Sequence, residues 1–263
     1  MNRIKKMCLI SVSAIFLAAC GDDSSSTSGP SDNGVSSSVI SDDDSRSSNS
    51  VSSSSTVAES SSNADTTMTD PRDNQVYRIV NIGDFTWMAE NLNYKVDSSY
   101  CYNDSAEKCE KYGRLYTWYA AVGMSKEECG VEHDYECVSE EEVVQGICPD
   151  GWHLPADWEW KVLFDLVGGQ GVAGVALKST SDWQKDGNGT DAYGFNVLPA
   201  GLKNGGGDYI SEGRSALFWS GIMEGPGISA YRVTFEDKYD NPILERTSYS
   251  GANYVRCVKN ELP

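Results

Sequence analysis

Eight cysteines are the residues of this 263-residue chain that can do covalent chemistry. Cys8 lies inside an apolar run near the N-terminus, and Cys20 follows the small residues Ala18 and Ala19. The other six are Cys101, Cys109, Cys129, Cys137, Cys148 and Cys257. A cysteine sulfur can carry an acyl chain, join a second sulfur in a disulfide or bind zinc as a thiolate. The compartment decides among these reactions, and the N-terminal sequence predicts the compartment.

The N-terminus has the pattern of a bacterial lipoprotein signal. A basic stretch at 2–6 (NRIKK) precedes an apolar run at 7–19, and Cys20 follows directly. A positive segment, a short apolar segment and small residues before the cut define a secretory signal. The apolar run has 13 residues, whereas a membrane-spanning helix needs roughly 20. We therefore expect cleavage after residue 19 and acylation of Cys20, rather than an uncleaved anchor or an incidental cysteine.

Residues 20–69 have the composition of a flexible tether. Serine supplies 20 of the 46 residues in 21–66, and none of the 46 is aromatic. Such a segment cannot bury enough apolar surface to offset the entropy of ordering it, so we expect disorder. Gly21 replaces the Asp that retains many lipoproteins at the inner membrane, and Asp22 and Asp23 resemble an export signal. These residues predict an outer-membrane lipoprotein facing the cell surface, with a periplasm-facing one as the alternative.

An oxidising compartment makes disulfides the first expectation for the six later cysteines. Six cysteines allow 15 pairings, but two pairs enclose only seven residues each, which leaves one long-range pair. The favoured disulfides are Cys101–Cys109, Cys129–Cys137 and Cys148–Cys257. A zinc site is the rival interpretation, and the lack of any CxxC pair and the presence of only two histidines argue against it.

Residues 70–263 predict one acidic domain. They hold all seven Trp and all 14 Tyr of the chain, and their length suits a single core. They carry 17 Lys and Arg against 31 Asp and Glu. This excess of negative charge excludes non-specific nucleic-acid binding, which requires clustered basic residues.

The histidines and carboxylates of this domain form no recognisable catalytic set. His153 lies between apolar neighbours and His133 among acidic ones, so we interpret the first as structural and the second as solvated. Glu159 is expected on a helix surface or in a buried hydrogen bond. A glycosidase needs two carboxylates at a defined separation, and the sequence singles out no such pair. We therefore expect no enzymatic activity.

Two groups of residues are candidates for ligand binding. Oxygen atoms at Asp186, Asn188 and Asp191 suit calcium, although a polar turn explains the same residues. Four aromatic residues lie in polar or glycine-rich segments, where an exposed ring can stack on a sugar. They are Trp183, Tyr209, Tyr239 and Tyr249. The aromatic residues expected in the core instead are Trp87, Trp118, Trp152, Trp160 and Trp219.

An α+β domain must position these residues. The pattern predicts strands at 75–82 and 85–88 around a turn at Gly83, and helices at 111–122 and 155–167. The second helix rests on Trp158, Val162, Leu163 and Leu166 at helical spacing. Further short strands are expected at 195–198, 216–219, 231–235 and 254–258. Helices first and a cluster of strands later argue against a parallel βαβ sheet.

Several motifs occur in a fixed order between residues 70 and 260. They are 73–77 (DNQVY), 87–94 (WMAENLNY), 113–116 (GRLY), 147–155 (ICPDGWHLP), 159–160 (EW), 194–201 (GFNVLPAG), 218–220 (FWS) and 255–258 (VRCV). Together they resemble the Fibrobacter succinogenes major paralogous domain, and the match covers nearly the whole predicted domain.

The resemblance implies a C-type lectin-like fold with two main helices, short and mostly antiparallel strands, and long loops stapled by disulfides. In such folds a cysteine before a Gly-x-x-Leu segment pairs with one on the last strand, which implies Cys148–Cys257 here. Segment 154–160 also resembles a helix of formylglycine-generating enzymes. Those enzymes rely on a late pair of reactive cysteines, whereas Cys257 stands alone in its region.

The sequence therefore favours a lipid-anchored surface module that binds an extracellular glycan or polysaccharide without catalysis. A structural or protein–protein interaction module of the envelope is the second hypothesis. An enzyme with an unfamiliar site is the third. The membrane is the one partner that the residues themselves predict.

Overall fold

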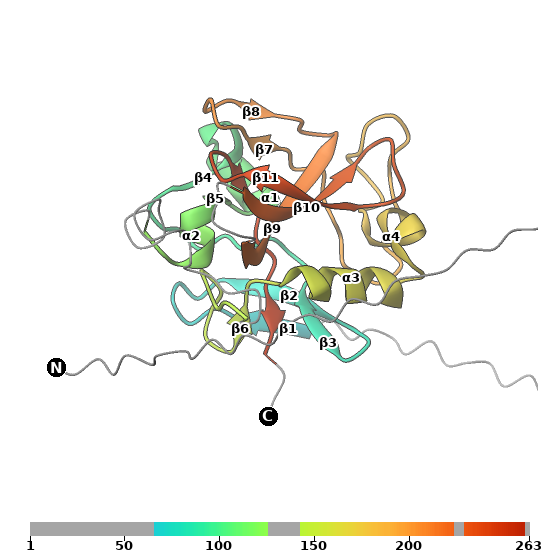
Figure 1. Cartoon of the computed structure of the whole chain (residues 1–263), viewed down its shortest axis with the longest axis horizontal. Helices are drawn as coiled ribbons and strands as arrows, with labels where there is room; N and C mark the ends of the chain where they lie inside the picture. The colour runs from blue at the N-terminus through green and yellow to red at the C-terminus, as the bar shows by residue number, and fades with distance from the viewer. Residues whose placement is uncertain (1–65, 126–142, 224–228, 261–263) are drawn as a thin grey trace, which may run out of the picture. The chain divides into compact units, whose positions relative to one another are not determined.

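A computed structural model describes residues 66–125, 143–223 and 229–260 (Figure 1). These residues belong to one unit, Glu59–Pro263. The predicted signal, Cys20, the predicted tether up to residue 65, and the segment with Cys129, His133 and Cys137 lie outside them. No helix in the described ranges is long and apolar enough to cross a membrane.

The predicted hairpin is present and forms the centre of a five-stranded sheet. Strands β2 (Val76–Ile82) and β3 (Phe85–Met88) pair antiparallel, with Ile82 opposite Phe85. Gly83 lies in the turn between them at φ +59°, a backbone conformation that favours glycine. The remaining strands of this sheet are β1 (Thr66–Thr69), β13 (Val258–Lys259) and β6 (Trp152–His153), in the order β1-β2-β3-β13-β6.

Strand β1 corrects the expected end of the tether. Residues 66–69 fall within the predicted tether, yet Thr66–Thr69 pairs with Val76–Ile79 of β2. Backbone hydrogen bonds to β2, together with packing of Met68 on the core, offset the entropy of ordering these four residues. The folded domain therefore begins a few residues earlier than residue 70.

Two further sheets complete the β structure, and all pairs between named strands are antiparallel. The three-stranded sheet consists of β9 (Ser215–Met223), β10 (Ser229–Glu236) and β11 (Ile243–Ser248), with β10 in the middle. The second five-stranded sheet has the order β4 (Ser99–Tyr100), β5 (Leu115–Thr117), β12 (Ala252–Asn253), β7 (Leu202–Lys203) and β8 (Tyr209–Ile210). The mixed α+β class is confirmed.

The expected strands later in the chain are only partly present. Residues 216–219 and 231–235 lie within β9 and β10, whereas 254–258 contributes only Val258 to a strand. At 195–198, Val197 forms an isolated bridge with Lys178 in place of a strand.

The described part of the chain has four α-helices rather than two main ones. They are α1 (Ala106–Tyr112), α2 (Trp118–Val122), α3 (Asp157–Leu166) and α4 (Gln170–Leu177), with a short 3₁₀ turn, η1 (Tyr102–Asp104), before α1. The helix predicted at 111–122 is wrong at 113–117: residues 111–112 end α1, whereas Leu115–Thr117 forms β5 and pairs with β4 and β12. Gly113 separates the two short helices at φ +74°, and Gly123 ends α2 as predicted, in the left-handed conformation.

Helix α3 is present, but the spacing used to predict it does not mark its buried face. Trp158 and Leu166 are exposed, at 45% and 43%. The buried side consists of Trp160, Leu163, Phe164 and Val167. These residues follow the i, i+3, i+4, i+7 spacing of a core stripe more closely.

The core is aromatic and joins α3 to two sheets. The ring of Trp160 lies 5.0 Å from that of Trp87 in β3 and 5.6 Å from that of Phe218 in β9. In Figure 1, α3 lies against the sheet that carries β2 and β3. The five tryptophans expected in the core are buried. Because α3 is fixed on its inner side, its outer side is presented rigidly to solvent.

Candidate functional site

The outer side of α3 presents the chain's one exposed tryptophan. All seven tryptophans are described, and six of them are 5% exposed or less, whereas Trp158 is 45% exposed. The ring of Phe85, at the start of β3, meets the Trp158 ring edge to face at 6.1 Å. A large apolar ring exposed to water indicates a binding surface when it borders a cavity, and the ring of Trp158 borders one.

A cavity of about 360 Å³ opens beside these rings. We call it the Trp158 cavity. Its lining residues are Phe85, Val143, Gln145, His153, Trp158, Glu159 and Asn260. Apolar rings therefore stand beside amide, imidazole and carboxylate groups, the combination found where small ligands bind.

A buried chain of hydrogen bonds forms the polar wall of the Trp158 cavity. His153 Nε2 lies 2.8 Å from Glu159 Oε1, and His153 Nδ1 lies 2.7 Å from Asn260 Oδ1. The other carboxylate oxygen of Glu159 accepts the N–H of Ala156 at 2.8 Å, at the start of α3. His153 and Glu159 are nearly fully buried. Both expectations for these residues, a structural histidine and a hydrogen-bonded glutamate, fit this geometry.

The hydrogen bonds of His153 restrict its protonation. The carboxylate of Glu159 only accepts, so Nε2 must carry a proton. A neutral ring then needs the NH₂ of Asn260 facing Nδ1, whereas an imidazolium donates to the amide oxygen. Either arrangement uses both ring nitrogens and holds the imidazole in place between Glu159 and Asn260.

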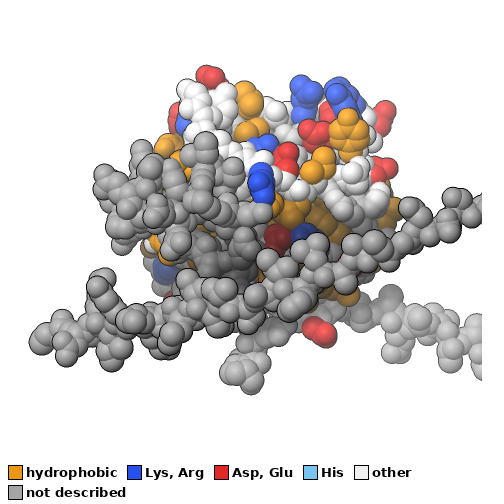
Figure 2. All heavy atoms as spheres, viewed as in Figure 1, with side chains coloured by type: hydrophobic (Ala, Val, Ile, Leu, Met, Phe, Trp, Pro, Cys, Tyr) orange, Lys and Arg blue, Asp and Glu red, His pale blue; other side chains and the backbone are white. Residues whose placement is uncertain are grey.

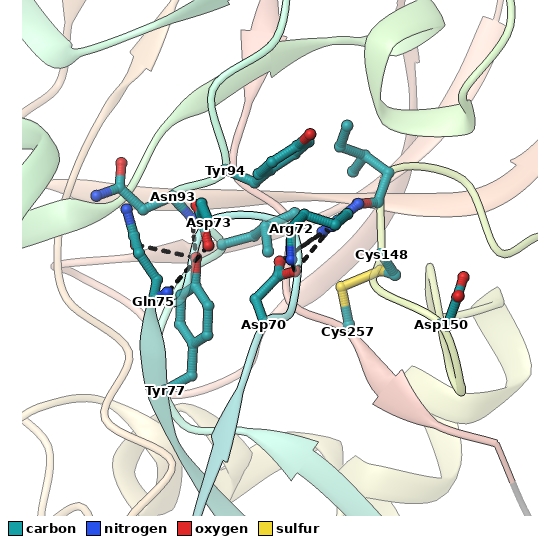
Figure 3. A network of polar contacts seen from close by, with 12 residues as sticks. Asp70, Arg72, Asp73, Gln75, Tyr77, Asn93, Tyr94, Cys148, Asp150 and Cys257 are labelled. Atoms are coloured by element: carbon teal, nitrogen blue, oxygen red, sulfur yellow. Dashed lines mark hydrogen bonds and ion pairs between the residues drawn. A yellow bond between two sulfur atoms is a disulfide. The ribbon is translucent and has the colours of Figure 1, made fainter.

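The segment that carries Gln145 and His153 is fixed by a disulfide and by Arg72 (Figure 3). Cys148 is bonded to Cys257, which precedes β13, with Cα atoms 5.9 Å apart. Gln145 Nε2 donates to Asp150 Oδ1 at 3.1 Å across the same loop. These contacts hold one wall of the Trp158 cavity against the last strand of the chain.

Arg72 joins this loop to the start of the domain. Its Nη1 donates to the carbonyl of Ile147 at 2.8 Å, and its Nη2 to Asp70 Oδ2 at 2.7 Å. Its guanidinium lies 4.0 Å from the centre of the Tyr94 ring, and Figure 3 labels both side chains. Burial raises the pKa of Asp70, but the hydrogen bonds and charge of Arg72 outweigh it and hold that pKa below its ordinary value. Asp70 is therefore a buried carboxylate that depends on Arg72.

The second disulfide present is Cys101–Cys109, which closes the η1 and α1 region. Both described disulfides are among the three expected pairs, and the third, Cys129–Cys137, lies outside the described residues. Neither Cys101 nor Cys109 lines the Trp158 cavity.

The four loop aromatics expected to bind sugar do not form one surface. The prediction that Trp183 lies at the surface is wrong. Trp183 is 5% exposed, and its indole N–H donates to Ser179 Oγ and the Val197 carbonyl. Tyr239 is 50% exposed. Tyr209 packs on Tyr102, and Tyr249 packs on Tyr119. None of the four lines the Trp158 cavity.

The oxygen atoms expected at a calcium site serve separate turns. Asn188 Oδ1 accepts the backbone N–H of Trp183 at 3.1 Å, and Asp191 Oδ1 accepts that of Asn196 at 2.6 Å. Asp186 and Asp191 have positive φ angles, which Asp tolerates in turns. Within the described ranges, no group of three or more His, Cys, Asp or Glu residues could hold a metal ion. The polar-turn interpretation fits these residues.

Sequence reasoning missed Trp158 as a surface residue. Its spacing with Val162 and Leu166 resembles a core stripe, and only the competing stripe of Trp160, Leu163 and Phe164 could have revealed the true orientation of α3. Apart from Glu159, the other cavity residues come from separate segments, 85, 143–145, 153 and 260, so no local pattern joins them.

Comparison with known families assigns most of this domain to one family. Residues 80–259 match the model described as the Fibrobacter succinogenes major domain, which is more than half of the chain. No curated protein and no solved structure matches the chain.

Proposed function

The chain belongs to the Fibrobacter succinogenes major domain family, and we propose that it is a lipid-anchored surface lipoprotein whose head binds polysaccharide. The head has a C-type lectin-like fold and no catalytic role. Cys20 carries the lipid, and the serine-rich segment holds the head away from the outer membrane.

The observation that carries the proposal is the position of Trp158. A sugar ring has an apolar face that stacks on a flat aromatic side chain, and hydroxyl groups at its edge that need hydrogen bonds. Trp158 offers the exposed ring, and Phe85 supports it from the side. Gln145 and Asn260 lie around the same cavity and supply polar atoms, and the buried His153 orients the amide of Asn260.

The charge of the domain favours a neutral polysaccharide. Residues 70–263 carry 31 acidic against 17 basic residues, and a polyanion is repelled by such a surface. On the face in Figure 2, red and blue side chains are interspersed among the described residues, without one broad basic patch. A chain of uncharged sugars meets no such repulsion.

The position of the disulfides supports the lectin-like fold and the location. Cys148 precedes the Gly-x-x-Leu segment, and Cys257 lies beside the last strand, as the resemblance implies. Disulfides persist in oxidising compartments, which agrees with the signal and with Cys20. The tether and anchor rest on the sequence alone.

Fluorescence quenching of the full-length protein in detergent micelles tests the proposal. Because six of the seven tryptophans are buried, iodide should quench Trp158 almost exclusively, and a bound neutral polysaccharide should protect it. Trp158→Phe should lose the quenchable signal and remain folded. If no polysaccharide reduces quenching, the proposal is wrong.

A protein-interaction module of the envelope is the second candidate. Leu166 is 43% exposed and lies against Gly83, in the turn that precedes Phe85, and Val143 is 48% exposed. These side chains extend the apolar surface beyond the Trp158 cavity, which suits a protein partner better than a sugar chain. Loss of partner binding in Leu166→Gln, with polysaccharide binding absent in the wild type, would favour this candidate.

A further inference from the structure

A second cavity of about 280 Å³ lies apart from the Trp158 cavity and shares no lining residue with it. We call it the Arg256 cavity. Amide side chains line much of its wall: Gln75, Asn91, Asn93 and Asn196. Its volume is slightly below the usual range for drug-sized ligands. A ligand of one sugar or one amino-acid residue would therefore suit it.

Arg256 is the buried cation of this cavity. It is 1% exposed. Its Nε donates to Asn91 Oδ1 at 2.9 Å, its Nη2 to the Asn196 carbonyl at 2.9 Å, and its Nη1 to the Phe195 carbonyl. The guanidinium also lies 4.5 Å from the centre of the Phe195 ring. These contacts orient the guanidinium but bring it no neutralising charge.

No carboxylate of the described residues forms an ion pair with Arg256. Asp191 and Glu90 attract it only through space, and one oxygen of Asp191 accepts the Asn196 N–H. Burial lowers the pKa of Arg256 to about 9. A buried charge without a partner is costly and is usually paired or functional.

A second polar atom at the same cavity also lacks a partner. Asn93 Oδ1 is buried and accepts no hydrogen bond within the described structure. The backbone N–H of Asn93 is already used, since it donates to the Tyr77 hydroxyl at 3.0 Å. A hydroxyl or amine of a ligand would satisfy the free oxygen, just as an anion would neutralise Arg256.

We propose that the Arg256 cavity binds a small ligand through a single carboxylate, with Arg256 as the attracting cation. Charge-assisted hydrogen bonds from a guanidinium are among the strongest available to a carboxylate. Glu90, Glu110 and Lys111 also line the cavity, and Glu90 and Lys111 form ion pairs with Arg78 and Asp182. The net negative charge of the domain opposes a polyanion, so the ligand carries an isolated carboxylate, as a single uronic acid or a peptide end does.

Calorimetry on the full-length protein in detergent micelles tests this proposal. The two acids to compare are D-glucuronate and N-acetyl-L-alanine, and their neutral counterparts are D-glucose and N-acetyl-L-alanine amide. At least one acid should bind ten times or more tightly than its counterpart, and which acid binds distinguishes a sugar from a peptide end. Equal binding of acid and counterpart, or no binding of either acid, would overturn the proposal.

Two variants test whether the acid binds in the Arg256 cavity. Asn93→Asp keeps the shape of a half-buried side chain but adds a negative charge, so affinity for the acid should fall at least tenfold. Arg256→Lys keeps the charge and loses the planar fork, and it should also weaken binding. Iodide quenching of Trp158 should stay unchanged when the acid binds. Unchanged affinity in a folded Asn93→Asp protein, or protection of Trp158 by the acid, would contradict the assignment to this cavity.

Discussion

His153 and Glu159 are joined at 2.8 Å, and this contact ties β6 to the first turn of α3. The same carboxylate accepts the Ala156 N–H, so one side chain both caps the helix and holds the imidazole. Trp158 lies between Asp157 and Glu159 in that turn. Its orientation toward solvent therefore depends on a buried polar pair directly beside it.

Replacement of Glu159 should loosen the wall of the Trp158 cavity. Glu159→Ala removes the acceptor of the Ala156 N–H and of His153 Nε2, and we expect a loss of about 2–4 kcal/mol in the free energy of unfolding. Glu159→Gln retains an acceptor and should lose about half as much. Urea unfolding followed by fluorescence measures both.

Glu107→Ala is the matched control, since Glu107 is an exposed acid in the first turn of α1. It should cost at most about 1 kcal/mol, the size of a helix-dipole effect. Equal losses for Glu107→Ala and Glu159→Ala would show that the His153 contact contributes no stability.

Removal of Arg72 should give a pH-dependent loss of stability. The pKa of Asp70 lies below its ordinary value in the folded state. The stability that this group contributes is therefore present above about pH 4 and is lost as the pH falls through the folded pKa. Arg72→Met leaves a buried carboxylate unpaired, so we expect a loss of about 3–5 kcal/mol at pH 7. The difference from wild type should narrow near pH 3, where Asp70 is protonated without a partner.

Arg214→Met serves as the control for Arg72. The Nε of Arg214 lies 3.9 Å from Asp237 Oδ2, and its side chain is 52% exposed. A loss below about 1 kcal/mol is expected at either pH. A pH-independent loss in Arg72→Met would indicate that Arg72 acts through packing on Tyr94 and not through the charge of Asp70.

The two described disulfides should contribute unequally. Cys148–Cys257 spans 109 residues and Cys101–Cys109 spans eight. Loop-closure entropy predicts losses of about 5 and about 2.5 kcal/mol when the pairs are replaced by serine. Loss of Cys148–Cys257 should also weaken polysaccharide binding, because it releases the segment with Gln145 and His153. Similar polysaccharide binding in both double variants would show that Cys148–Cys257 does not support the Trp158 cavity.

Cys20 should decide membrane attachment. Cys20→Ser removes the sulfur that carries the lipid, so the protein should move from the membrane fraction to the soluble fraction and lose incorporation of radiolabelled palmitate. Cys8→Ser changes a cysteine of the removed signal and should behave as wild type. Palmitate incorporation that persists in Cys20→Ser would refute the proposed anchor.

Local signals account for the parts of the fold that the sequence predicted. The β2–β3 hairpin follows from Gly83 in a two-residue turn, and the end of α2 follows from Gly123. The prediction of one helix over 111–122 is wrong in its middle, because Leu115–Thr117 pairs with residues more than 130 positions later. The periodicity of a segment cannot indicate such a distant partner.

The candidate site was less predictable than the fold, for a physical reason. Two apolar stripes share α3, and only the contacts of Trp160 with Trp87 and Phe218 decide which one faces the core. Once that choice is made, Trp158 must face outward. Arg256 likewise becomes a candidate binding residue only because no carboxylate forms an ion pair with it in the described structure. The spacing of residues along the sequence cannot show this.

Retention on insoluble neutral polysaccharide tests whether Trp158 carries polysaccharide binding. Wild-type protein, Trp158→Ala and Tyr239→Ala should be compared in detergent micelles, because Tyr239 is equally exposed but lies outside the Trp158 cavity. Truncation of a central aromatic contact costs about 2 kcal/mol or more, roughly thirtyfold in affinity. Wild type and Tyr239→Ala should be retained, and Trp158→Ala should not. Retention of a folded Trp158→Ala protein to the same extent as wild type would contradict the claim.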